Sequence, residues 1–496
     1  MWRYCKREAR SSGLRPEGRQ PEYTLSAGKR FESAVIGIVL ALAALFSVLA
    51  LGGVETFGFA PAQIAVVLLA TGIFWQRGFP RVSVLTWVAL TALLVLPALQ
   101  LVPLPRPWVE AVLPQRAALT EALLVPIGAL APTQALSLSP YETKLALLRL
   151  ACYLLVFLLA FVAQRSRREV LGLATALLGI GVLLAAYGCI QFLIGQQYIF
   201  EYRRWIPAYN ATGTFVNRNH FAGLLEMIVP FLLAQVLFAR WAAGSSRRSP
   251  WVNLIVSPLS SRLLLRIVLL SLLCIALIFS RSRMGLMAGI GGMLVVGAIV
   301  FLQKRQRSVL LAMALVLAIP MAYSLWIGIS PVVQRFERLT QEGYLETDRL
   351  PVWRDTLTLI GDYPLTGTGL GTYRWTNQHY QTSRFSGTYE HAHNDYLEFA
   401  SEIGIPAAAL LFGSLWVLVI RTARCALSLE SVRDRTLAAG CAGAMAAILI
   451  HGITDFNLQI PSNALIFAWI AGTAAALVRN PDRPEPLAGQ VEVLSG

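Results

Sequence analysis

The sequence predicts an all-α protein that crosses a membrane about twelve times. Its composition is the first observation: 56% of the 496 residues are hydrophobic, 14% are charged, and the mean hydropathy is +0.59. Soluble proteins of this length carry far more charge on their surfaces. The second observation is that the apolar residues form runs of roughly 20, the length that a membrane-spanning helix requires.

The distribution of basic residues is the third observation, and it indicates the topology. The net charge of +15 is compatible with nucleic-acid binding, but the basic residues lie in short clusters between the apolar runs. With the N-terminus inside, these clusters fall on alternate, cytoplasmic loops, as the positive-inside rule requires. We therefore expect a multi-pass protein in the lipid bilayer of a cytoplasmic membrane, with no nucleic-acid partner.

Twelve apolar runs are the expected spans. They cover residues 33–51, 61–75, 82–99, 145–163, 170–193, 221–239, 263–279, 284–302, 308–327, 406–424, 436–453 and 462–478. The chain then divides into a basic cytoplasmic tail (1–32), spans one to nine (33–327), a large periplasmic loop with short helices (328–405), spans ten to twelve (406–478) and a cytoplasmic tail (479–496). In an earlier loop, residues 108–124 are expected to form a short interfacial helix.

The large loop is expected to carry the reactive residues. A connection this long inside a compact domain is usually functional or disordered. Its aromatic residues favour a folded lid; they include Trp353, Tyr363, Tyr373, Trp375, Tyr380 and Phe385.

Neither a metal nor a cofactor is expected. The six cysteines form no C-x-x-C pair, and four of them fall inside apolar runs, so a zinc site or disulfide framework finds no support. Glu55, in the first external loop, is a single acidic residue, which is weak evidence for a metal site. Gly367, Gly369 and Gly371 resemble a phosphate loop, but no G-K-[ST] follows, so turns are the better interpretation.

Two arginines in the turn SRSRMG run against the charge bias. Arg281 and Arg283 lie between apolar runs on the external side, without an acid nearby in the sequence. An arginine at the membrane normally has an anionic partner, so we expect that partner to be a ligand. On a helix, side chains two residues apart point to different sides. We expect Arg283 to face inward and Arg281 to reach the interface.

Loop 195–220 adds Arg203, Arg204 and Arg218 on the same external face. Arginine grips phosphate oxygens with two parallel hydrogen bonds. Several arginines beside hydrocarbon therefore indicate a lipid phosphate or diphosphate. Binding of phospholipid head groups is the alternative for any single arginine.

His393 is the candidate general base. It precedes YLEFASEIG, an amphipathic run for which Asp395 is the expected N-cap and Glu398 the capping-box acid. Gly404 and Pro406 would end this helix. The positive helix end would keep the imidazole neutral and able to accept a proton, whereas the two carboxylates would raise its pKa. A capping or packing role is the alternative.

Three further histidine and acidic residues accompany it. His391 is the second choice for the base, because it lies outside the expected helix start. His451 and Asp455, four residues apart, lie on one helix face. They are expected to form a hydrogen-bonded pair that either supports the site or is simply structural.

These residues resemble the O-antigen ligase and O-antigen polymerase superfamily of bacterial polytopic glycosyltransferases. The family's histidine motif is His, then Asn, Ser or Gln, then nine residues and Gly, which His393, Asn394 and Gly404 satisfy. An Arg-x-x-x-Leu motif lies on Arg335 to Leu339, and TGTFVNRNHFAG, SRSRMG and GTGLGTY resemble further landmarks. The ligase motif usually ends in Thr or Tyr shortly after its glycine, whereas Ile-Pro-Ala follows here. Ligase and polymerase therefore both stay open.

The resemblance implies an inverting, metal-independent transfer of a glycan from undecaprenyl diphosphate in lipopolysaccharide or exopolysaccharide biosynthesis. The acceptor would be a growing glycan, lipid A core or a protein. His393 would take the proton of the acceptor hydroxyl, and Arg218 and Arg283 would stabilise the departing diphosphate. The other expected substrate-binding residues are Arg281, Arg203, Arg204, Arg335, Asn394 and His391, with His451 and Asp455 in support.

A flippase or transporter of lipid-linked oligosaccharide is the alternative from another class, and a non-catalytic scaffold is a third. A transporter would place charges near the middle of the bilayer and show repeated halves. Here the unusual charges are expected at one membrane face, together with the long loop. That asymmetry favours an enzyme.

Overall fold

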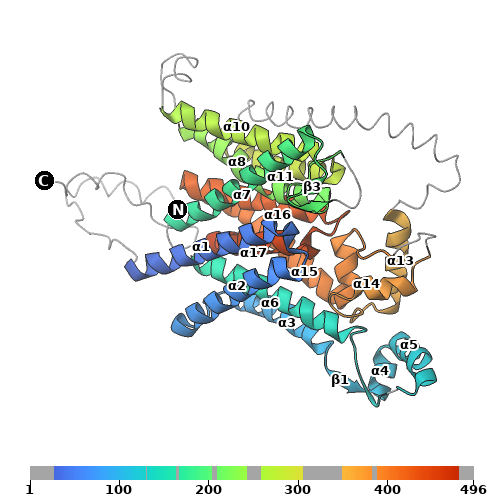
Figure 1. Ribbon diagram of the computed structural model, residues 1–496. Coiled ribbons are helices and arrows are strands. Elements are labelled where there is room, and N and C mark those ends of the chain that lie inside the picture. Colours follow the sequence, from blue (N-terminus) through green and yellow to red (C-terminus); the bar gives the residue numbers. More distant parts are fainter. Residues whose placement is uncertain are drawn as a thin grey trace, which may run out of the picture.

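The computed structural model describes residues 27–129, 131–163, 167–203, 209–242, 258–304, 349–382 and 388–479. These residues are mostly helical (Figure 1). The long helices are α1 (Ala27–Leu49), α2 (Thr56–Arg77), α3 (Val84–Leu99), α6 (Pro140–Ala163), α7 (Arg167–Leu193), α8 (Arg218–Ala242), α10 (Pro258–Phe279), α11 (Arg283–Lys304), α13 (Arg349–Asp362), α15 (Asp395–Ser428), α16 (Val432–His451) and α17 (Pro461–Arg479).

The remaining elements are short. They are η2 (Leu51–Gly53), β1 (Pro103–Pro105), α4 (Arg106–Val112), α5 (Pro114–Leu124), η3 (Val125–Ile127), β2 (Thr133–Ala135), β3 (Tyr198–Ile199), β4 (Tyr202–Arg203), α14 (Tyr373–Thr376), η5 (Asn377–His379) and η6 (Asn457–Gln459). The four strands form two antiparallel pairs, β1 with β2 and β3 with β4. The interfacial helix expected at 108–124 is two helices, because the chain bends at Leu113 and Pro114 restarts it.

Nine helices of the described chain are long and apolar enough to cross a membrane. This confirms an all-α polytopic membrane protein, but not the number twelve. The expected span 82–99 corresponds to a shorter apolar helix, Thr86–Leu99, and α16 covers the expected span 436–453 without being among the nine. The expected span 308–327 lies outside the described residues.

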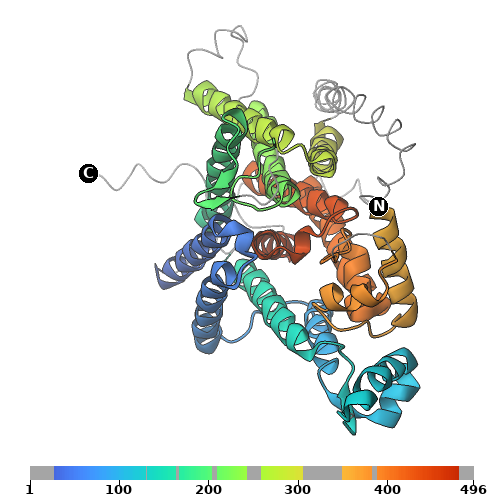
Figure 2. The ribbon, with the colours of Figure 1, turned by 45° about the vertical axis from the view of Figure 1, so that its right-hand side comes forward.

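Helices α8, α16 and α17 form the centre of the bundle. Helix α17 lies in the middle of the view in Figure 2, ringed by α1, α2, α6, α8, α15 and α16. Most side chains of α8 and α17 are buried. Helices α11 and α16 pack closely because Gly292 meets Gly443: a Cβ on Gly292 would lie 2.6 Å from the Gly443 carbonyl oxygen.

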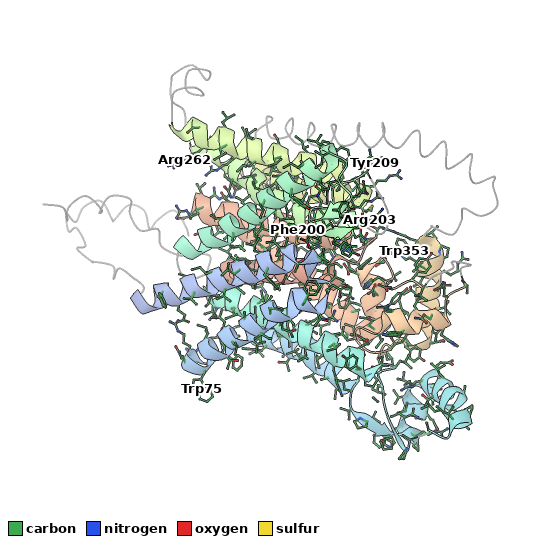
Figure 3. The ribbon with its side chains drawn as sticks, in the orientation of Figure 1. Trp75, Phe200, Arg203, Tyr209, Arg262 and Trp353 are labelled. Carbon is green, nitrogen blue, oxygen red and sulfur yellow. The ribbon has the colours of Figure 1, made fainter. Side chains whose placement is uncertain are left out.

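The short elements gather at one end of the bundle. Helices α4, α5, α13 and α14 all lie beyond this end, and α1 begins at the opposite end (Figure 1). Arg203 and Trp353 lie toward it, whereas Trp75 and Arg262 lie at the opposite end (Figure 3). We call it the site end, because the candidate residues described below also lie there.

A glycine-rich segment positions the start of α15. Thr368 and Gly369 donate backbone hydrogen bonds of 2.9 Å to the carbonyls of Ser401 and Glu402. Gly404 (φ +80°) breaks the helix at this point, and a Cβ there would lie 2.2 Å from the Leu365 carbonyl oxygen. Only glycine permits both the left-handed backbone and this approach. The break expected at position 404 is therefore present, although helix resumes at once and continues to Ser428.

Candidate active site

The turn between α16 and α17 places one buried carboxylate at the centre of the site end. The Asp455 side chain is fully buried. Its Oδ2 atom accepts from Asn219 Nδ2 at the start of α8, and from Arg349 Nη2 at the start of α13 at 3.2 Å. Asp455 therefore joins a bundle helix to a helix of the large loop.

Two histidines complete the surroundings of this carboxylate. His220 Nε2 and His393 Nδ1 each lie 3.8 Å from Asp455 Oδ1, which is ion-pair distance but longer than a hydrogen bond. Burial alone would raise the pKa of Asp455, but its interactions with His220 and His393 outweigh burial and hold that pKa well below its usual value. Asp455 is therefore ionised at neutral pH.

His393 is held by its neighbours in an uncommon backbone conformation. Its φ is +51°, in the left-handed region that non-glycine residues seldom adopt. Ala392, just before it, donates from its N–H to Glu398 Oε2 (2.8 Å) and accepts from Trp353 Nε1 (3.1 Å). Asp395, two residues later, donates its N–H to the carbonyl of Gly452 at 2.7 Å. Contacts on both sides therefore fix the imidazole, 30% of which is exposed.

The N-cap of α15 differs from the sequence prediction by one residue. Asn394, not Asp395, is the cap, and its Oδ1 accepts from the N–H of Leu397 at 3.1 Å. Asn394 therefore has a capping role, while Asp395 is buried against the turn at Gly452. Glu398 closes no capping box with Asp395, because its two oxygens bind His391 and Ala392 instead.

One aromatic ring contacts three histidines. His391 stacks on Phe456 with ring centroids 3.9 Å apart, and His220 and His393 approach the same ring edge-on at 4.7 and 4.9 Å. The rings of His391 and His393 are therefore within about 9 Å of each other.

His391 has a carboxylate partner of its own. Its Nδ1 atom lies 2.7 Å from Glu398 Oε1. Burial lowers the pKa of His391, but the charge and hydrogen bond of Glu398 dominate, so that this pKa is raised.

Arginines gather near the same carboxylate, Asp455. Arg218, the first residue of α8, lies within electrostatic range of Arg281, Arg283 and Arg349. Arg218, Arg281 and Arg283 are exposed. We call these four residues the arginine cluster. The charge of Asp455 reaches Arg218, and Arg349 Nη2 lies 3.2 Å from Asp455 Oδ2, so the cluster brings four guanidinium groups near this carboxylate.

The two arginines of SRSRMG both have exposed side chains. Arg283 lies at the start of α11 within electrostatic range of Arg218, and its inward orientation stays a prediction. Arg281 (φ +55°) lies in the turn before that helix, with its guanidinium 5.5 Å from the centre of the Phe192 ring. Both therefore remain available to a ligand at the site end.

The structure describes one of the three other predicted arginines, Arg203. Arg203 is exposed on the β3–β4 hairpin, and in the described part of the chain no hydrogen bond or ion pair joins it to His393 or Asp455. Arg204 and Arg335 lie outside the described residues.

His451 and Asp455 do not form the side-chain pair that their spacing predicted. His451 Nδ1 lies 2.9 Å from Glu226 Oε2 of α8, and both side chains are fully buried. The link to Asp455 is through the backbone: the N–H of Asp455 donates to the carbonyl of His451 at 3.1 Å. The Glu226–His451 pair thus holds the end of α16 against α8, directly before the turn that carries Asp455.

Residues 268–412 match the family model of the O-antigen ligases. This stretch of the chain is therefore similar to the O-antigen ligases. The matched segment includes Arg281, Arg283, Arg349, His391 and His393. No curated protein matches the chain. This similarity and the nine apolar helices of the described chain support a multi-pass membrane protein with a glycosyltransferase-like role in polysaccharide assembly.

Several residues of the site escaped the sequence analysis. They are Asn219, His220, Glu226, Arg349 and Phe456. The only signal for the first two was their position in NRNH, directly beside Arg218. Arg349 and Phe456 carried no sequence signal, because their roles depend on α13 docking against the turn that follows α16.

Proposed function

We propose that this protein transfers a glycan from undecaprenyl diphosphate to an acceptor hydroxyl, at the periplasmic face of the inner membrane, with inversion and without a metal ion. One observation carries the proposal: the arginine cluster and His393 both approach one buried, ionised carboxylate, Asp455. The arginines are suited to bind a diphosphate, and His393 is suited to take the proton from an acceptor hydroxyl.

His393 acts as the general base in this mechanism. The acceptor oxygen attacks the anomeric carbon of the donor sugar while its proton passes to the imidazole. Asp455, 3.8 Å from Nδ1, stabilises the imidazolium that forms. Such a positioned base is worth typically about 10²–10⁴-fold in rate.

The arginine cluster stabilises the leaving group. The bond between the anomeric carbon and the diphosphate oxygen breaks, and its electron pair departs with undecaprenyl diphosphate. Arg218, Arg281, Arg283 and Arg349 are placed to meet the negative charge that develops on this oxygen. Because the acceptor attacks opposite the leaving group, the anomeric configuration inverts.

Reconstitution tests the proposal. The purified protein in liposomes is supplied with a defined undecaprenyl-diphosphate-linked glycan and separate pools of glycan, lipid A core and protein acceptors. We expect one pool to become glycosylated, undecaprenyl diphosphate to be released in equal amount, and NMR to show inverted configuration at the new linkage. Movement of the intact donor across the bilayer without transfer to any pool would instead indicate a transporter, and a retained configuration would exclude the single displacement.

A further inference from the structure

Asp395 is a buried carboxylate to which the proposed mechanism gives no role. It is the first residue of α15, two residues after His393, and its side chain is fully buried. Asn394 caps the helix, so Asp395 is not needed as the cap. Its contacts lie instead with the turn between α16 and α17, which carries Asp455.

The backbone N–H of Asp395 donates to the first half of this turn. The first N–H groups of a helix have no partner inside it. Here the N–H of Asp395 is shared between the carbonyl of Gly452 at 2.7 Å and the carbonyl of Asp455 at 3.0 Å. The start of α15 is thereby joined to the main chain of Asp455 itself.

The side chain of Asp395 holds the second half of the turn. Its Oδ2 atom accepts from the N–H of Leu458 at 3.2 Å. Leu458 belongs to η6, which follows Asp455 in the chain. Asp395 therefore bonds to the turn both before and after Asp455, once through its main chain and once through its side chain.

Gly452 shows how closely the carboxylate fits the turn. Its φ of −58° is open to any residue, so its backbone conformation does not require glycine. A Cβ there, however, would lie 2.9 Å from Asp395 Oδ2 and 3.3 Å from Asp395 Cβ. Because Asp395 is fully buried among packed neighbours, its carboxylate could not move aside without leaving the turn. The contact between the two residues thus depends on the missing side chain at position 452.

The position of Asp455 matters because its side chain meets three partners at once. Its carboxylate accepts from Asn219 and Arg349 and lies 3.8 Å from His393 Nδ1. Misplacement of a reacting group by about 1 Å can lower a rate about 10²-fold. We propose that Asp395 is a positioning residue, which holds the turn through hydrogen bonds so that Asp455 faces His393. This inference rests on the proposed function, in which Asp455 stabilises the imidazolium.

Hydrogen exchange tests the contact without any transfer. Exchange of the peptide that covers residues 452–460 is followed by mass spectrometry on the full-length protein in nanodiscs. We expect it to be about tenfold faster in Asp395→Ala and unchanged in Asp395→Asn, because the amide oxygen can accept from the same N–H. Asp355→Ala is the matched control: Asp355 is also buried and accepts from a backbone N–H, that of Thr382 at 3.1 Å. Wild-type exchange in Asp395→Ala, or equal acceleration in Asp355→Ala, would overturn the proposal.

Transfer kinetics in liposomes then distinguish positioning from a contribution to stability alone. We expect Asp395→Ala to lower kcat about tenfold or more and Asp395→Asn to keep the wild-type value. In an Asp455→Asn background, Asp395→Ala should lower kcat by less than about twofold further, because the effects of residues that act together are not additive. Losses that multiply independently, or a loss in Asp395→Asn equal to that in Asp395→Ala, would contradict the proposal.

Gly452→Ala is a second variant, and it leaves every polar group in place. It should reproduce the faster exchange and the lower kcat of Asp395→Ala, because the new Cβ displaces the carboxylate from the turn. Gly179→Ala of α7 is its matched control, since a Cβ there meets no atom within 4 Å. Wild-type exchange and kcat in Gly452→Ala would overturn the proposal. Absence of transfer by the wild-type protein would contradict the proposed function instead, and the exchange result would still decide whether Asp395 holds the turn.

Discussion

His391 and His393 are two residues apart, yet their carboxylate partners differ. His393 Nδ1 lies 3.8 Å from Asp455 Oδ1, the carboxylate near which the arginine cluster gathers. His391 is bonded to Glu398 at 2.7 Å. Both rings touch Phe456. One turn of chain, with His393 in the left-handed region, thus gives the two histidines different carboxylate partners, and they need not share a role.

Replacement of each histidine gives the largest expected difference. We expect His393→Ala to lower kcat about 10²–10⁴-fold, because the base is lost. His391→Ala should mainly raise KM for the acceptor, by about tenfold or less. Steady-state transfer assays in liposomes measure both, with melting temperatures as the control for folding. If His391→Ala lowers kcat and His393→Ala does not, His391 is the base, and the assignment proposed above is reversed.

The arginine cluster gives the next largest effect. Arg283→Lys keeps the charge but loses the two-pronged grip on phosphate, and a hydrogen bond to a charged group is worth about 1.5–3 kcal/mol. We expect KM for the donor to rise about tenfold or more, with KM for the acceptor unchanged. Arg203→Lys, on the exposed β3–β4 hairpin, is the matched control and should leave donor kinetics unchanged. Equal effects of the two substitutions would show that the arginine cluster is not a distinct binding site for the donor.

The pH dependence of stability should report His391. Its folded-state pKa is raised, mainly by Glu398 against the opposing effect of burial. Its protonation therefore stabilises the fold below the unfolded value of about 6.5, and this contribution is lost as pH rises through the raised pKa. We expect the melting temperature in detergent to fall as the pH rises from about 6.5 through the raised pKa of His391. Glu398→Gln should flatten the dependence, whereas an unchanged profile would show that the pair does not titrate there.

Chelation should have the smallest effect. If arginines supply the positive charge that the leaving group needs, transfer should proceed equally with and without EDTA. The assay is run on protein dialysed against the chelator, with magnesium and manganese added back as the control. Loss of transfer that either ion restores would require a metal in the mechanism.

The limits of sequence prediction follow from what each residue depends on. Composition and charge patterning predicted a helical membrane protein because hydrocarbon thickness acts on each span separately. Gly404 was predicted as a break because its backbone requirement is local. Three side-chain assignments needed the folded chain: Asn394 as the cap, Glu226 as the partner of His451, and Arg349 beside Asp455. Each depends on helices that are distant in sequence or on the course of one turn, which spacing alone does not determine.

Binding of undecaprenyl diphosphate tests the central claim most directly, because the claim is that the arginine cluster near Asp455 holds the diphosphate of the donor. Its dissociation constant is measured in nanodiscs for the wild-type protein, for a double variant with Arg218→Gln and Arg283→Gln, and for Glu402→Gln. The account predicts about tenfold or weaker binding by the arginine variant and wild-type binding by Glu402→Gln. Wild-type affinity in the arginine variant, with altered affinity in Glu402→Gln, would contradict it.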